Sequence, residues 1–326
     1  MKVTTPLLLL TLCLTASATN YYVSPTGNDT SGEGTQGKPW FTLNKAWTYV
    51  SAGDTVYMRG GTYYYGRQSL TGKDGSKENH ILILAYPGER PSLKKAGSYA
   101  NIGWPRAILN ISGDYIHIKG LEISYNTQEN SEGYYGLILV NGNHNIFELL
   151  DVHHNGGTGI SIEYNSTDNL ILNCDVHHNA DPLTTDKYGN AGGIGFSHIP
   201  AGLHNTVQGC RLWLNSDDGL DTYGSDCKIT IDNCWAWYNG YLSEKFELGG
   251  NGTGFKLGIT RADYGNTILR TITNCIAYKN KNSGFHQNGA MAGIELYNNT
   301  AFQNGDEGFW FGSYAKAVSY THLTRP

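Results

Sequence analysis

The stretch Cys174-Asp-Val-His-His-Asn179 repeats Leu150-Asp-Val-His-His-Asn155 with its asparagine 24 residues further on, and this repeat decides the fold. The same pattern continues outward in both directions, as Leu121-Glu-Ile-Ser-Tyr-Asn126, Cys210-Arg-Leu-Trp-Leu-Asn215, Cys234-Trp-Ala-Trp-Tyr-Asn239, Cys275-Ile-Ala-Tyr-Lys-Asn280 and Asn299-Thr-Ala-Phe-Gln-Asn304. Subtraction of the asparagine numbers gives intervals of 29, 24, 36, 24, 41 and 24 residues. After most asparagines comes a glycine followed by an apolar residue, as in Gly219-Leu220 and Gly254-Phe255.

A unit of about two dozen residues made of short strands and turns cannot bury its own apolar face, so successive units must stack. The pattern therefore predicts an all-β parallel β-helix, in which equivalent positions form ladders along the axis. We expect the asparagines to exchange side-chain hydrogen bonds, and Cys174, Cys210, Cys234 and Cys275 to form a ladder of reduced, buried thiols. A β-propeller or sandwich is the alternative, but propeller blades are longer and more regular than these units.

The ends of the chain differ from the repeat. Lys2, the apolar run Pro6 to Leu14 and Ala16-Ser-Ala18 have the features of a signal peptide over residues 1–19, so we expect a secreted protein, extracellular or periplasmic. We expect one β-helix domain over residues 20–314 and assign no role to the tail, 315–326. An amphipathic helix that caps the coil is predicted from the helical spacing of Trp40, Leu43, Ala46, Trp47 and Val50.

Charge excludes one class of partner. The formal net charge of −5 provides no basic field for nucleic acid, and after the signal no apolar run is long enough to cross a bilayer. We expect a monomer. The paired histidines at 153–154 and 177–178 suggest a metal motif, but adjacent strand residues face opposite ways, which favours a repeat ladder over a zinc site.

The stretch Asn215-Ser-Asp-Asp-Gly-Leu-Asp221 places three carboxylates in five positions. In the repeat frame, Leu220 and Phe255 point inward, so Asp221 and Lys256 fall side by side on the outer face, one turn apart. We expect Asp218 to project at the turn. Oxygen ligands without sulfur or imidazole suit a hard cation, and calcium accepts several carboxylates in loose geometry. These aspartates could alternatively cap turns.

Lys256 lies between Gly254 and Gly258, beside the acidic cluster. An exposed lysine is usually a solvated surface charge, but next to a bound cation its neutral amine becomes accessible and can serve as a general base. This combination suits β-elimination in a uronic-acid polymer, where a base removes the C5 proton and a cation stabilises the charge that develops beside the carboxylate.

These two stretches, the repeat and the opening Tyr21-Tyr-Val-Ser-Pro25 resemble the pectate lyases of polysaccharide lyase family nine, from about Asn20 to Gly312. The resemblance implies a right-handed coil, a Ca²⁺ ion held by Asp217, Asp218 and Asp221, and Lys256 as the Brønsted base. It implies an acidic plant cell-wall polysaccharide, pectate or polygalacturonate, as the substrate.

The family has a further metal-binding aspartate in the preceding turn. Here the segment Asn190 to Ile194 contains no carboxylate, and Asp181 and Asp186 lie just upstream. Arg261 and His286 are candidate substrate contacts. Three alternatives stay open: a lyase for another uronic-acid polymer such as rhamnogalacturonan, a pectin-degrading glycoside hydrolase on the same coil, and a non-catalytic carbohydrate-binding β-helix.

Overall fold

The computed structural model describes residues 18–258, 262–312 and 318–324. Most of the signal peptide expected from the sequence, residues 1–17, lies outside this range, as does Arg261. Within the described ranges, no helix is both long enough and apolar enough to pass through a lipid bilayer.

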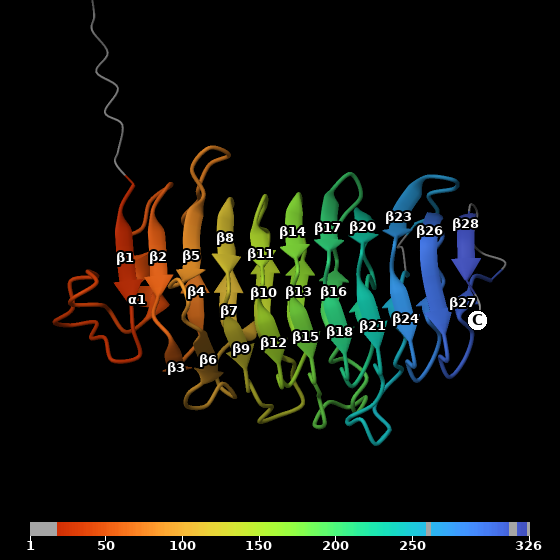
Figure 1. The fold of residues 1–326 in the computed structure, drawn as a ribbon, viewed down its shortest axis with the longest axis horizontal. Helices are drawn as coiled ribbons and strands as arrows, with labels where there is room; N and C mark the ends of the chain where they lie inside the picture. Colours follow the sequence, from red (N-terminus) through yellow and green to blue (C-terminus); the bar gives the residue numbers. More distant parts are fainter. Residues whose placement is uncertain (1–17, 259–261, 313–317, 325–326) are drawn as a thin grey trace, which may run out of the picture.

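The chain winds into stacked coils of parallel strands, as the repeat predicts (Figure 1). Among the described residues, one sheet has nine strands: β4 (Gln68–Leu70), β7 (Arg106–Ile111), β10 (Tyr134–Val140), β13 (Ile160–Glu163), β16 (Ile194–Ser197), β19 (Leu220–Asp221), β22 (Phe255–Lys256), β25 (Phe285–His286) and β27 (Phe309–Trp310). Each strand pairs in parallel with the corresponding strand of the next coil. The β-helix is therefore confirmed.

The second sheet is formed by two rows of strands. The first row is β1 (Asn20–Val23), β2 (Thr55–Met58), β5 (Ile81–Ala85), β8 (Ile116–Lys119), β11 (Ile146–Glu148), β14 (Asn169–Leu172), β17 (His204–Gln208), β20 (Lys228–Asp232) and β23 (Ile268–Thr273). The other row is β3 (Gly61–Tyr65), β6 (Pro91–Lys95), β9 (Glu122–Ser124), β12 (Asp151–His153), β15 (Asp175–His177), β18 (Arg211–Trp213), β21 (Trp235–Trp237) and β24 (Ile276–Tyr278). The long strand β26 (Gly293–Phe302) pairs with both β23 and β24 and so joins the rows.

The helix expected near the N-terminus is short. The structure has α1 (Leu43–Trp47), five residues long, which begins after Thr42, whose side chain accepts a hydrogen bond from the Lys45 amide. All five residues of the expected apolar face are buried, although Trp40 lies outside the helix, in a bridge with Val23. That this segment caps the coil stays a prediction. At the other end, β28 (Val318–Thr324) pairs in parallel with β26.

The asparagine ladder forms as expected. Asn179 is fully buried; its Nδ2 donates to Asn215 Oδ1 at 2.9 Å, and its own Oδ1 accepts from Asn155 Nδ2 at 3.0 Å. A second ladder, Asn145, Asn169 and Asn205, was not recognised in the sequence because it lies outside the six-residue motif. The cysteines of the predicted ladder are buried and free.

The glycine before each inward-pointing residue has a steric reason. A Cβ at Gly254 would lie 2.7 Å from the Gly284 carbonyl oxygen and 2.8 Å from Asn280 Nδ2. Only glycine allows the asparagine amide and the backbone of the next coil to approach this closely. The following residues fill the interior: Phe255 and Phe285 stack with ring centroids 4.9 Å apart.

Candidate active site

Neighbouring strands of the nine-stranded sheet bring together a predicted Ca²⁺ ligand, Asp221, and the predicted base, Lys256. In the pairing of β19 with β22, Leu220 lies opposite Phe255 and Asp221 opposite Lys256. The predicted neighbours Asp221 and Lys256 are confirmed in register, and the same register continues as an outer column of Ser161, Gly195, Asp221, Lys256, His286 and Trp310. Because side chains alternate along each strand, the inward direction of Phe255 requires the side chain of Lys256 to point outward.

Lys256 bridges two carboxylates. Its Nζ lies 2.8 Å from Asp218 Oδ2 and 3.2 Å from Asp221 Oδ2, and its side chain is only 15% exposed. Burial lowers the pKa of the ammonium, but the charges of the neighbouring carboxylates, Asp218 first, outweigh burial and raise the pKa of Lys256 above its usual value. Without a bound cation, the amine is therefore protonated and paired.

The three aspartates have different environments. Asp218 does not project from the turn as expected; its side chain is fully buried, because the next coil packs over the turn and the Thr253 amide donates to Asp218 Oδ1 at 2.7 Å. Asp217 lines the cleft above it and accepts from the Asn251 amide at 3.0 Å. Asp221 accepts from the Tyr223 amide at 2.9 Å.

Electrostatics distinguish this cluster from a row of turn caps. Burial, together with the charge of Asp218, raises the pKa of Asp217 to about 9 and that of Asp221 to about 7. Turn-capping carboxylates on a wet surface keep low pKa values, whereas these two are short of positive charge. A donor set made only of oxygen atoms, with surplus negative charge, fits a hard divalent cation such as Ca²⁺.

The two upstream aspartates have separate roles. Asp181 is buried, and its oxygens accept from the amides of Asn190 and Ala191 and from Ser216 Oγ, each at 3.2 Å, so it organises the loop. Asp186 is exposed and lines the cleft with Asp217 and Asp221. Of the two, Asp186 is the one among the residues that line this cleft.

The cleft extends along the coil axis from Lys256 toward earlier coils and encloses about 380 Å³. Besides Lys256, Asp217, Asp221 and Asp186, its lining residues are Tyr135, Thr158, Ser161, Glu163, Gly189, Asn190, Gly192, Ile194, Gly195, Phe196, Ser197, Tyr223 and Asn251. Sequence reasoning missed Glu163, although it stands two residues after Ser161 and so shares its outward direction.

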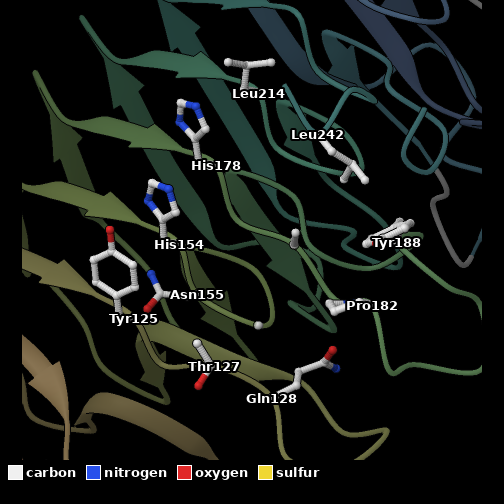
Figure 2. A pocket seen from close by; sticks show the side chains of 12 residues that line it. Tyr125, Thr127, Gln128, His154, Asn155, His178, Pro182, Tyr188, Leu214 and Leu242 are labelled. Atoms are coloured by element: carbon white, nitrogen blue, oxygen red, sulfur yellow. The ribbon is translucent and has the colours of Figure 1, made fainter. Parts of the chain in front are cut away.

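A second groove, of about 420 Å³, has a lining that does not include the three aspartates beside Lys256; Figure 2 shows its lining side chains. Tyr125, His154 and His178 project into it from successive coils, and the two imidazoles stack with centroids 5.0 Å apart. The histidine ladder is confirmed, but the expectation that adjacent histidines face opposite ways is wrong for His153 and His154. His154 has φ of 54°, so its ring turns toward His153 and their Nδ1 atoms lie 2.7 Å apart.

Another group of potential metal ligands appears on the second sheet. Glu122, Asp151 and His153 each offer one ligand atom, and these atoms lie within 4.8 Å of one another. The guanidinium of Arg90 already pairs with both Glu122 and Asp151. This group is therefore an ion-pair network held by a guanidinium that cannot lose its proton, whereas the amine of Lys256 can, so the aspartates beside Lys256 are the better candidate for a cation.

Of the two candidate substrate contacts, Arg261 lies outside the described residues. His286 pairs in register with Lys256 and stacks on Trp310 with ring centroids 4.3 Å apart. Its Nδ1 accepts from the Asn288 amide at 2.8 Å. His286 therefore stands next to the amine, on the opposite side from Asp221.

The chain is similar to several proteins of known name. A family model described as "Pel9A-like, right handed beta helix region" matches residues 21–319, which confirms the expected handedness. Pectate lyase L of Dickeya chrysanthemi is 33% identical over 307 residues, covering 91% of this chain and 68% of that protein. A solved rhamnogalacturonan lyase has a TM-score of 0.76 at 27% identity, covering 93% of this chain and 84% of that one. The crystal structure of pectate lyase Pel9A has a TM-score of 0.75 at 27% identity, covering 95% and 79%.

Proposed function

The chain belongs to the Pel9A-like right-handed β-helix family and is a polysaccharide lyase, and we propose that it cleaves pectate, the polygalacturonate of plant cell walls, by β-elimination with Lys256 as the base. The observation that carries the proposal is the position of one amine, 2.8 Å and 3.2 Å from two carboxylates at the end of a polar cleft.

The proposed reaction breaks two bonds of the polymer. The neutral amine of Lys256 takes the proton from C5 of a galacturonate residue, and the electron pair forms a double bond between C4 and C5. The C4–O bond to the next sugar breaks, and its oxygen leaves and is protonated. A lysine whose charge responds to its neighbours is suited to this role, because it can be neutral in one electrostatic state and protonated in another.

Asp217 and Asp221, which line the cleft, would hold Ca²⁺ together with Asp218 beneath them. When bound, the ion would neutralise the uronate carboxylate and so make the adjacent C5 proton more acidic. Burial and the charge of Asp218 raise the pKa values of Asp217 and Asp221, and the charges of the three aspartates, Asp218 first, raise the pKa of Lys256. His286, in register beside Lys256, and Arg261 are proposed substrate contacts.

The test is the growth of ultraviolet absorbance on polygalacturonate, because elimination creates an unsaturated uronate and hydrolysis does not. We expect activity with calcium, its loss with a chelator, and a loss of about a hundredfold or more in Lys256→Ala. The matched control is Lys228→Ala, an exposed lysine of β20. Reducing ends without absorbance would indicate the glycoside hydrolase, and binding without turnover the non-catalytic protein.

Rhamnogalacturonan is the second candidate polymer. The solved rhamnogalacturonan lyase and Pel9A match this chain equally in identity and almost equally in TM-score, so the fold does not choose between their substrates. We further propose that the protein is secreted, from the predicted signal peptide over residues 1–19, and that it acts as a monomer.

A further inference from the structure

The charge of the cleft is unusual for a site that binds a polyanion. Among the residues that the structure describes, Lys256 is the one lysine or arginine in its lining. The acidic residues Asp186 and Glu163 line it in addition to Asp217 and Asp221. A homopolymer of uronates brings a negative charge to every sugar position, and such charges need cations or a bound metal close by.

Glu163 and Tyr135 line the part of the cleft away from the amine. It lies in β13, two residues beyond Ser161, and three coils separate Ser161 from Lys256 in the outer column, roughly 14 Å at the usual interstrand spacing. Glu163 is only 7% exposed, and its Oε1 accepts from Ser161 Oγ at 2.8 Å. Burial raises the pKa of Glu163, and burial together with the charge of Glu163 raises the pKa of the Tyr135 phenol.

The floor between the two ends is formed in part by Gly195 and Thr158. Gly195 occupies the outer column between Asp221 and Ser161, and its φ is outside the left-handed region, so the backbone does not require glycine there. A Cβ at this position would lie 3.2 Å from Thr158 Cγ2, so a larger residue would crowd the Thr158 methyl group. Both residues line the cleft between the amine and Glu163.

We propose that Glu163, Ser161 and Tyr135 form a subsite for an uncharged sugar residue of the polymer whose uronate lies at Lys256. The inference rests on the proposed function and specifies the substrate further. A uronate at this subsite would meet the Glu163 carboxyl, which would either repel it or have to take up a proton. The hydroxyl groups of a neutral sugar, or of a methyl-esterified uronate, can instead donate to Glu163 and exchange hydrogen bonds with Ser161 and Tyr135.

The experiment compares kcat/KM, from ultraviolet absorbance, on three polymers with calcium present. The polymers are polygalacturonate, partially methyl-esterified polygalacturonate, and a polymer that alternates galacturonate with rhamnose. We expect the wild type to prefer at least one of the two polymers with uncharged residues over polygalacturonate. The preferred polymer identifies whether the uncharged sugar is a methyl-esterified uronate or rhamnose. Glu163→Lys should reduce the preference at least about tenfold, equivalent to about 1.4 kcal/mol. Glu163→Gln should reduce it less, and Glu295→Lys in β26 of the other sheet should leave it unchanged.

The ratio of the kcat/KM values between polymers separates recognition from stability, because a damaged fold lowers kcat/KM on every polymer together. If Glu163→Lys does not fold, the isosteric Glu163→Gln still gives the ratio. An unchanged ratio in the folded Glu163 variants, or a wild type that prefers polygalacturonate, would overturn the subsite. Absence of unsaturated product from all three polymers would instead reject the proposed function.

Discussion

Replacement of Lys256 should affect stability and activity separately. Asp218 has a fully buried side chain, and the Lys256 ammonium 2.8 Å away is its charged partner. In Lys256→Met this carboxylate loses that partner, and removing one member of a buried ion pair costs roughly 3–5 kcal/mol. At about 2 °C per kcal/mol for a chain of this size, the melting temperature should fall by roughly 6–10 °C in a chelator. Lys256→Arg keeps a cation and should lose much less.

The activities of Lys256→Arg and Lys256→Met should not follow the order of their melting temperatures. A guanidinium stays protonated, so Lys256→Arg should lose the general base as fully as Lys256→Met does, by about 10²–10⁴ in kcat/KM. The assays are thermal unfolding followed by tryptophan fluorescence, with chelator and with calcium, and absorbance growth on polygalacturonate. Lys228→Met is the control for removing an exposed lysine. Calcium should restore much of the melting temperature of Lys256→Met, because a cation returns to the carboxylates, without restoring its activity.

Two results would refute this reasoning. An arginine variant with activity within tenfold of the wild type would show that no neutral amine is required. A methionine variant that melts with the wild type in chelator would show that Asp218 does not depend on the ammonium.

Three further predictions concern the coil and its cation. Asn179→Ala removes a buried rung of the asparagine ladder and should cost roughly 2–5 kcal/mol in denaturant unfolding, because its partners stay buried without a replacement; the exposed Asn101→Ala should cost less than about 0.5 kcal/mol. Gly254→Ala should cost roughly 1–3 kcal/mol, since its Cβ would meet backbone of the next coil, and a melting temperature equal to wild type would contradict the steric argument. Finally, the pKa values of Asp217 and Asp221 are raised in the folded protein, so without a cation their contribution to stability falls as pH rises from about 4 to about 9. Added calcium should therefore raise the melting temperature more at pH 8 than at pH 5, and an equal increase at both values would exclude these groups as the ligands.

The regular part of the fold was readable from the chain because a ladder requires the same residue type in every coil. The asparagines and the glycine–apolar pairs recur at each turn, and each has one role that only stacking provides. The N-terminal helix was less predictable. Its apolar spacing extends from Trp40 to Val50, but the helix covers only Leu43–Trp47, because Trp40 bridges to Val23 in an extended conformation.

Alternation within a strand also predicted the pairing of Asp221 with Lys256, since an inward neighbour fixes the direction of each. The same rule failed at turns. Asp218 stands in a turn, where the next coil covers it, and His154 has a left-handed backbone that rotates its ring toward His153. Side-chain direction at such positions depends on backbone dihedrals that periodicity does not contain.

By itself, the sequence determined the stacking of coils, the strand register and the presence of an amine beside a group of carboxylates, because these follow from a repeat and from alternation. Only the tertiary structure decided which carboxylate is buried beneath the amine, which of the upstream aspartates lines the cleft, and that Glu163 lines the cleft at a distance from the amine. These depend on how loops of different length fold over neighbouring coils, and the burial and charge that result are properties of residues distant in the chain.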